Sequence, residues 1–480
     1  MTYLKSAFFV LFVSAGVLAE SQPSGPASVL ARILAEKGAI TAADLSKVES
    51  AAEEERVTIL AGLLQQKGLL TREDLARLNV IPQPAPPQGS QHKAEAPPVV
   101  AQGKEPVTIY GSLLLNAFMN TAGANIQDIP LFANKQGSDP SGGDKNFGMT
   151  ARQSRFGLLY HGPQIGNAAI SGQVEVDFFG GSAALPNGLN MDLLRLRLAY
   201  GRLDWRNISL EAGQDWSVFA PLNPTTLAEY AVPGLSTSGN LWIRTPQLRA
   251  EYRQSLGDAT HLVWQIAATD PNMGDYPTAT FQTVRTPEIG ERGRMPGADA
   301  RLAWTTRYDG RDFSVGLSSH YGHGKNFGLV ANQNVQTSVD LWGVALDYSL
   351  PINRIFALTG EAFEGRALGI FSGASGEAIQ PPGTSGQHGV ETRGGWMQAQ
   401  INFSRKWQAN LAYGIEAPDA SQLPLGNRSR NQTYMGNIMY KISPALTWAW
   451  EYRRFLTDFR NQLAADERGD HVNMAIAYTF

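Results

Sequence analysis

The chain has 480 residues, no cysteine and a formal net charge of -3. Without thiols it can form neither disulfides nor thiolate metal centres, and its charge gives no general attraction to nucleic acid, so we expect no nucleic-acid partner. Beyond residue 20, no apolar run approaches the roughly 20 residues that a transmembrane helix needs, which excludes a helical membrane protein.

Residues 1–19 have the pattern of an export signal. Lys5 supplies a basic start, residues 7–17 are mostly apolar, and the small residue Ala19 stands before Glu20. Signal peptidase requires a basic start, a short apolar core and a small-residue exit. We therefore predict a signal peptide over residues 1–19 and a mature protein in the cell envelope.

Residues 20–81 contain an internal repeat. The spacing of Leu, Lys-Gly, Thr and Asp in residues 30–45 returns in residues 60–75, so that Thr41 corresponds to Thr71. Each unit is typical of a helical hairpin in which this threonine caps the second helix. The pattern resembles small hairpins attached to other bacterial envelope and secretion proteins. We predict a periplasmic module that binds peptidoglycan or a periplasmic protein, or forms oligomers; the alternative is a simple spacer.

Residues 82–106 differ from both of their neighbours in composition. Pro, Gln, Ala and Gly dominate, with scattered charges. Such a segment cannot bury enough apolar surface to fold, which predicts an extended, flexible linker between two domains.

From residue 107 to residue 480, polar and apolar residues alternate in segments of about ten residues, a pattern typical of membrane-barrel strands. In residues 170–178, the apolar side chains take the even positions. Leu196, Leu198 and Tyr200 also share one parity, opposite Arg195 and Arg197. The alternation alone is also compatible with a soluble sandwich, which would turn its apolar face inward.

The connections between these segments favour the barrel. Short turns alternate with long, polar, Gly-rich loops, as in outer-membrane barrels, whose short turns are periplasmic and whose long loops lie outside. This predicts a 16-stranded antiparallel transmembrane β-barrel over residues 107–480. The predicted outside loops are 120–148, 179–190, 217–239, 270–297, 322–338, 364–390, 417–429 and 457–469.

Aromatic residues gather near the expected strand ends, where amphipathic rings favour the water–lipid boundaries. We expect them to form girdles in contact with outer-membrane lipid and lipopolysaccharide. Tyr478 and Phe480 end an alternating segment and resemble the terminal signal that barrels present to their insertion machinery. The other predicted girdle residues are Tyr160, Tyr200, Tyr252, Tyr308, Tyr348, Tyr440, Trp448, Trp450 and Tyr452.

Three short stretches are more specific than the alternation. Residues 212–219 read AGQDWSVF, residues 224–227 read PTTL, and residues 242–249 read WIRTPQLR. This order resembles the sequence around the third outside loop of DcaP-like trimeric porins. The resemblance implies a homotrimer whose third loop folds into the barrel and narrows it. It also implies substrates that are small and often anionic, such as dicarboxylates.

Charged residues of the polar parity should face the lumen, because burying an arginine against lipid at the bilayer midplane costs roughly 2 to 4 kcal/mol. Opposed rows of charge across a narrow pore would create a transverse field and select ions, and we expect a mild preference for anions. The alternative is that these charges pair along the wall and only stiffen it. The candidate residues are Arg155, Glu175, Asp177, Arg195, Arg197, Glu211, Asp215, Arg249, Glu251, Arg301 and Arg307, with Arg244 close to the loop.

Other functions find less support. His320 and His323 lie close in sequence without a neighbouring carboxylate, and no nucleophile elbow or phosphate-binding Gly-Lys-Ser motif occurs, so we expect neither an enzyme nor a cofactor or metal site. A phosphate-selective porin of the O/P type is an alternative, but acidic residues accompany the arginines here. A barrel that mainly tethers the envelope through residues 20–81 is another.

Overall fold

The computed structural model divides the chain into two units, Met1–Ala85 and Pro86–Phe480. The structure describes parts of 31–67 and residues 107–135, 145–181, 192–273, 287–308, 310–330, 333–373, 389–460 and 467–480. The predicted signal peptide, linker and Thr71 cap lie outside the described residues.

The first unit contains helix α2 (Ala42–Glu49). As predicted, Thr41 caps this helix: its Oγ1 accepts from the Asp44 backbone N–H at 3.2 Å, and the Asp44 carboxylate accepts from the Thr41 backbone N–H at 3.0 Å. Lys67 from the second repeat lies 3.2 Å from the Asp44 carboxylate and joins the two repeats. Ala31, Ile40, Val48 and Leu60 form the small core of this unit. The binding partners of this unit remain predictions.

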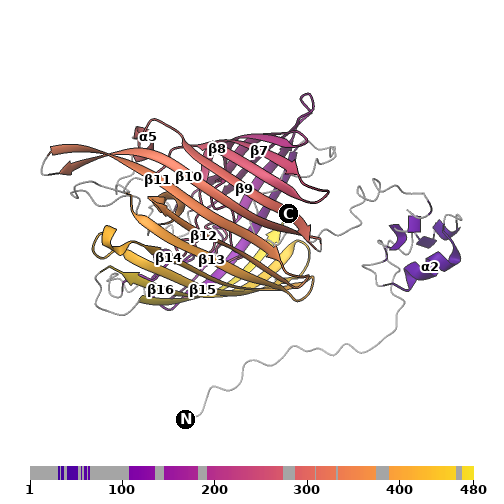
Figure 1. Ribbon diagram of the computed structural model, residues 1–480. Coiled ribbons are helices and arrows are strands. Elements are labelled where there is room, and N and C mark those ends of the chain that lie inside the picture. The colour runs from indigo at the N-terminus through magenta and orange to yellow at the C-terminus, as the bar shows by residue number, and fades with distance from the viewer. Residues whose placement is uncertain are drawn as a thin grey trace, which may run out of the picture. The chain divides into compact units, whose positions relative to one another are not determined.

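The second unit is an antiparallel β-barrel with few helices (Figure 1). Short helical segments are α5 (Ile289–Arg292), η1 (Leu368–Phe371) and η3 (Ala420–Gln422). The strands are β1 (Val107–Asn120), β2 (Asn146–Thr150), β3 (Arg155–His161), β4 (Ala169–Asp177), β5 (Arg195–Asp204), β6 (Ile208–Trp216), β7 (Arg244–Ser255), β8 (His261–Thr269), β9 (Gly297–Tyr308), β10 (Arg311–Val330), β11 (Gln333–Pro351), β12 (Phe356–Arg366), β13 (Glu391–Asn402), β14 (Trp407–Pro418), β15 (Arg428–Lys441), β16 (Leu446–Phe459) and β17 (Glu467–Thr479).

The barrel is closed by β1, which pairs with β17 on one side and with both β2 and β3 on the other. Because β2 and β3 pair with successive parts of β1, they form one interrupted crossing of the wall. The 17 strand segments therefore make 16 barrel strands, which confirms the predicted fold. Among the described residues, no helix is long and apolar enough to cross a membrane.

The outer surface of the barrel is largely apolar. Along β1 and β17, outward residues such as Leu113, Leu115, Met474 and Ile476 are exposed, whereas their inward neighbours are buried. A sheet with a period of two and an apolar exterior fits a lipid environment.

Two details of the wall differ from the sequence prediction. A β-bulge makes Arg197 an extra residue on β5, because Glu175 pairs with Leu198 while Val176 pairs with Leu196. Leu198 and Tyr200 therefore face the interior, and Tyr200 donates a 2.6 Å hydrogen bond to Gln173, so its place in an outer girdle was wrong.

The predicted outside loop 322–338 is mostly strand. β10 continues to Val330 and β11 begins at Gln333, so the two strands form a hairpin that extends past the rim (Figure 1). Beyond the rim, the two strands pair with each other although no third strand lies beside them. The hairpin lies at the long-loop end of the barrel.

Candidate pore constriction

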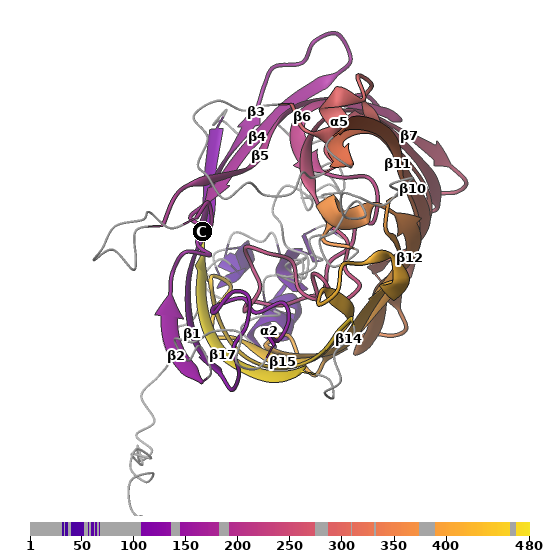
Figure 2. The same cartoon turned by 90° about the vertical axis from the view of Figure 1, so that its left-hand side faces the viewer.

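The segment 217–241 leaves the wall after β6 and lies inside the ring of strands (Figure 2). Nearly all of its residues are buried. Its turns use the left-handed region at Ala220, Leu235 and Thr237. Gly239 has a φ of 95°, and a Cβ there would lie 2.1 Å from the Gly395 carbonyl oxygen, so the loop touches the wall backbone where only glycine fits. The fold-back that the family resemblance implied is present.

Amide side chains of the wall hold the loop backbone. Gln153 Nε2 donates to the Ala228 carbonyl oxygen at 2.9 Å, and its Oε1 accepts from the backbone N–H groups of Tyr230 (2.7 Å) and Ala231 (3.0 Å). Gln398 accepts from the Thr225 N–H at 2.9 Å and donates to its carbonyl oxygen at 3.2 Å. Buried backbone groups of an irregular segment need such partners. The wall therefore fixes the path of the loop.

Apolar contacts reinforce these bonds. Phe219 packs edge to face on Phe371 with 5.2 Å between ring centroids, in a cluster with Leu341 and Leu368. Further along, Leu227 joins a second cluster that includes Leu114, Met439 and Ala475 on the wall. The loop therefore covers apolar inward side chains on β1, β11, β15 and β17.

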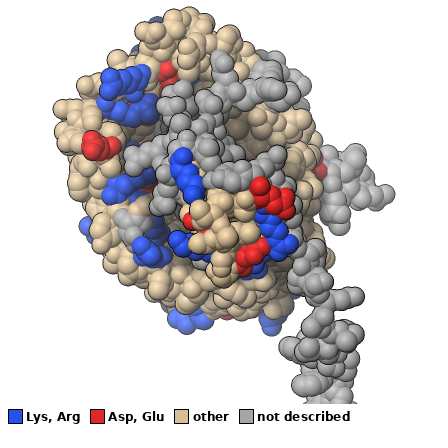
Figure 3. All heavy atoms as spheres, turned by 90° about the vertical axis from the view of Figure 1, so that its right-hand side faces the viewer, with Lys and Arg blue, Asp and Glu red and all other residues tan. Residues whose placement is uncertain are grey.

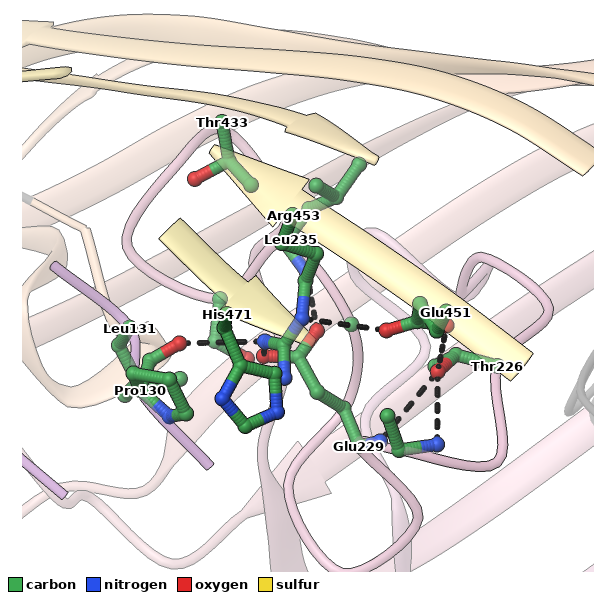
Figure 4. A network of polar contacts seen from close by, with 12 residues as sticks. Pro130, Leu131, Thr226, Glu229, Leu235, Thr433, Glu451, Arg453 and His471 are labelled. Atoms are coloured by element: carbon green, nitrogen blue, oxygen red, sulfur yellow. Dashed lines mark hydrogen bonds and ion pairs between the residues drawn. The ribbon is translucent and has the colours of Figure 1, made fainter. Parts of the chain in front are cut away.

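A buried ion pair anchors the middle of the loop (Figure 4). Loop residue Glu229 bonds to Arg453 of β16, and neither side chain is exposed to any significant degree. Glu451 lies 3.1 Å from Arg453 and also accepts a 2.6 Å hydrogen bond from Thr226. Two carboxylates thus share one guanidinium. Burial, together with repulsion from Glu451, raises the pKa of Glu229 to about 7.

The opposite wall carries predicted charged residues in close pairs. Arg195 binds Asp177 through two contacts of 3.0 and 2.6 Å. Arg197 reaches both Glu175 (2.6 Å) and Asp177 (3.0 Å). Arg195 also donates to the Ala231 carbonyl oxygen at 2.7 Å, which connects this charged cluster to the loop. Four of the predicted residues therefore form one group on β4 and β5.

Arg155 and Arg244 extend this group through contacts with the loop and with aromatic rings. Arg155 donates to the Tyr230 carbonyl oxygen and lies 3.5 Å from the centroid of that ring. Arg244 lies between two indoles, with its guanidinium carbon 4.7 Å from Trp216 and 5.1 Å from Trp242. Toward the long-loop end, the wall formed by β3–β7 therefore brings four arginines together with two carboxylates.

Glu211, Asp215, Arg249 and Glu251 lie on β6 and β7. Arg249 bonds to Glu211 and lies 3.1 Å from Asp215. Glu251 accepts from Gln265 at 2.7 Å. This cluster contains further charged residues that were not predicted to face the lumen. They are Arg202, Asp204 and Arg253, which pair with Glu211, Ser209 and Glu251 or with one another.

The two remaining predicted residues lie apart from the constriction. Arg301 pairs with Asp347 at 2.9 and 2.6 Å on β9 and β11. Arg307 pairs loosely with Asp312 at 3.3 Å near the short-turn end, where its side chain is 61% exposed. Figure 3 is viewed from this end and shows basic and acidic side chains along the edge of the barrel. Neither residue contacts the loop.

His320 and His323, the two histidines that lie close in sequence, each contact an aspartate. His320 Nδ1 lies 2.5 Å from Asp299, which also accepts hydrogen bonds from Ser217 Oγ (2.7 Å) and the Val218 N–H (3.1 Å). His320 thus supports the start of the loop. His323 contacts Asp340 at 2.7 Å on the outer surface. Among the described residues, no three His, Asp or Glu side chains are placed to hold a metal ion.

A search of solved structures gives the fold a counterpart. The crystal structure of the outer membrane channel DcaP of Acinetobacter baumannii matches with a TM-score of 0.58 and 21% identity over 78% of this chain and 97% of that one. The chain has the fold of a DcaP-type porin. A Salmonella typhi OmpF structure in complex with daunomycin matches with a TM-score of 0.50 and 15% identity, over 78% of this chain and 97% of that one. No protein-family model and no curated protein matches the sequence.

Proposed function

We propose that the protein is an outer-membrane porin, a water-filled channel for passive diffusion of small hydrophilic solutes that prefers anions such as dicarboxylates. Three features support the proposal: the closed barrel with its apolar exterior, the buried loop that narrows the lumen, and the porin fold. The long loops face the outside and the short turns face the periplasm. No enzymatic step is part of this function.

The observation that carries the anion preference is the charge imbalance beside the loop. Arg155, Arg195, Arg197 and Arg244 gather around Glu175 and Asp177 on this part of the wall. A narrow, low-dielectric passage strengthens the field of the unbalanced charges and concentrates the opposite ion. The paired arginines also stiffen the wall, so both roles considered from the sequence can operate together.

The test is the reversal potential of the purified, full-length protein in planar bilayers under a salt gradient. Replacing both Arg195 and Arg197 by Ala leaves the carboxylates of Glu175 and Asp177 without their partners. The relative permeability to cations should therefore rise severalfold, and the added effect should fall at high salt because of screening.

The matched control is Arg307→Ala, which removes an equally charged residue that lies outside the constriction. This variant should keep the parent reversal potential. An unchanged potential in the double variant, or an equal shift in the control, would contradict the assignment of selectivity to these arginines.

The assembly is part of the proposal. We expect a homotrimer, a periplasmic location for residues 20–81, and recognition of Tyr478 and Phe480 by the insertion machinery. Phe480 already pairs with Gly111 through two backbone hydrogen bonds of 3.0 and 3.1 Å, which places it at the closing seam of the barrel. Conductance that closes in three equal steps would support the trimer, and single steps only would contradict it.

A further inference from the structure

The outer surface of the barrel is not uniform at its long-loop rim. On β1, β2 and the segment before β5, the outward residues at this rim include Met119, Phe147 and Leu194, which are apolar and exposed. On β15, β16 and β17, the outward rim residues include Arg430, Arg454 and Arg468 instead. These three arginines face away from the lumen, so lining of the pore does not account for them.

Strand register places the three arginines together. Arg454 lies opposite Asp470, Arg468 lies opposite Leu456, and Arg430 lies opposite Asp458. Asp458 is four positions after Arg454 on β16. At a rise of about 3.3 Å per residue, the patch is therefore about 13 Å long. Its three strands make it about 10 Å wide. Long guanidinium side chains can converge on one ligand over this distance.

The acids within the patch do not neutralise it. Asp458 is paired with Arg430 at 2.5 Å. Asp470 accepts a 2.7 Å hydrogen bond from Tyr452 and lies 3.6 Å from Arg454, which keeps 43% of its side chain exposed. In the part of the chain that the structure describes, Arg468 is exposed and has no ion pair. Among the described outward residues, the patch therefore holds three guanidinium groups and two carboxylates, and Asp470 is only loosely bound to its arginine.

The surroundings of the patch indicate a lipid. The next outward residues toward the barrel middle are Val472, Met474 and Trp450, which are apolar, and the rings of Tyr434 and Tyr452 flank the arginines. Tyrosine rings and guanidinium groups above an apolar belt are typical of a membrane boundary. A ligand at this place presents an anionic group to the arginines and acyl chains to the belt below.

We infer that the outer face of β15–β17 binds the phosphorylated headgroup of an outer-leaflet lipid through Arg430, Arg454 and Arg468. Guanidinium groups bind phosphate oxygens in a bidentate manner, and one phosphate would balance the excess charge of the patch. The inference rests on the proposed location and orientation of the porin, because only then does the long-loop rim meet the outer leaflet.

A second charged region on the same rim gives a matched control. On β12 and β13, Glu364, Arg366, Glu391 and Arg393 also face outward, but here two acids balance two bases. Arg366 and Glu391 are paired at 2.5 Å. Because this region has no excess positive charge, Arg393→Gln removes one outward arginine without touching the proposed lipid site.

The experiment uses the full-length protein, refolded in detergent free of lipopolysaccharide, and measures binding of lipid A with two phosphates and of lipid A from which both phosphates have been removed. The parent should prefer the phosphorylated lipid. The triple variant R430Q/R454Q/R468Q should bind it about tenfold more weakly or worse, whereas R393Q should bind it like the parent. The single variant R468Q, which breaks no ion pair, provides the same test if the triple variant fails to fold.

Inorganic phosphate is a third ligand. If millimolar phosphate alone bound as well as the phosphorylated lipid does, the patch would be a free-phosphate site and the lipid assignment would be overturned. Equal affinity for phosphorylated and dephosphorylated lipid would also overturn it, as would parent-like binding by the R468Q and triple variants. Bilayer conductance of the same samples separates the two proposals: channels that conduct normally without lipid discrimination contradict only the lipid site, whereas samples that do not conduct contradict the porin function.

Discussion

The two sides of the lumen wall hold their polar groups in different ways. From β12 to β17, the inward polar residues are mostly amides and hydroxyls, such as Gln398, Asn431 and Thr433, which bond to the loop or to one another. From β3 to β7, the inward residues are mostly arginines and carboxylates that bond across neighbouring strands. Segment 217–241 covers the first side, and it meets the second side at Tyr230 and Ala231, whose carbonyl oxygens accept hydrogen bonds from Arg155 and Arg195.

Under the proposed function, this difference separates the support of the loop from the selection of ions. Neutral amides satisfy buried backbone groups without adding a charge that would need its own partner, so they suit a wall that must hold a loop. Ion pairs in a wet lumen keep their field while they fix their own geometry. Charged groups also occur on the supporting side: Glu229 pairs with Arg453, and the carboxylates of Glu361 and Glu451 accept hydrogen bonds from loop residues.

Removing the Glu229–Arg453 ion pair should have the largest effect on stability. Arg453→Met leaves Glu229 and Glu451 buried without a counter-charge, and breaking a buried pair in this way costs about 3 to 5 kcal/mol. The thermal unfolding midpoint in detergent should fall, and single-channel conductance should become larger and noisier as the loop loosens. The double variant E229Q/R453M should recover part of the stability. Equal stability of the parent, single and double variants would show that the pair does not anchor the loop.

A change of pH should test the same pair more gently. The pKa of Glu229 is raised by burial to about 7, above its ordinary value of 4.5. The folded state therefore holds this proton more tightly than the unfolded state, so its contribution to stability is complete below about pH 4.5 and is lost as the pH rises through 7. The slope is at most about 1.4 kcal/mol per pH unit for one group.

Thermal unfolding measured between pH 4.5 and pH 8 checks this expectation. Glu229→Gln should reduce the pH dependence, because the amide resembles the protonated acid. A parent midpoint that rises over this range, or a dependence of undiminished size in the variant, would assign the titration to other groups.

Removing one neutral support should have a smaller effect. Gln153→Leu leaves the Tyr230 N–H, the Ala231 N–H and the Ala228 carbonyl oxygen without their partner, at a cost of about 1 to 3 kcal/mol. Gln408→Leu is the control, since Gln408 bonds to Asn410 of its own strand and not to the loop. Only the first variant should raise the noise of the open channel; equal noise in both would remove the special role of Gln153.

Much of the barrel could be predicted from the sequence, because its main determinant is local. The alternation along residues 170–178 and the short and long connections specify strand, face and turn without tertiary information. The buried loop was found through the resemblance at residues 212–249. The inward direction of Glu175, Asp177, Arg195 and Arg197 follows from the same alternation.

The remainder depends on contacts between distant residues. The bulge at Arg197 inverts the parity of Leu198 and Tyr200, and no residue type there marks an insertion. The pair Glu229–Arg453 joins residues 224 positions apart, and Gln153 reaches the loop across 75 positions or more. Nothing near these residues in sequence indicates their partners, so the supporting side of the lumen was missed.

The fixed backbone of the buried loop has a consequence for how such a channel can change. Where the backbone is held by wall amides and by the close approach at Gly239, the upper size of a permeating solute is determined by main-chain position. Under the proposed function, the charge that a solute meets is determined by side chains on the other strands. Substitutions among those arginines would then alter which ions pass while leaving the molecular-weight cut-off unchanged, so that the two properties could evolve independently.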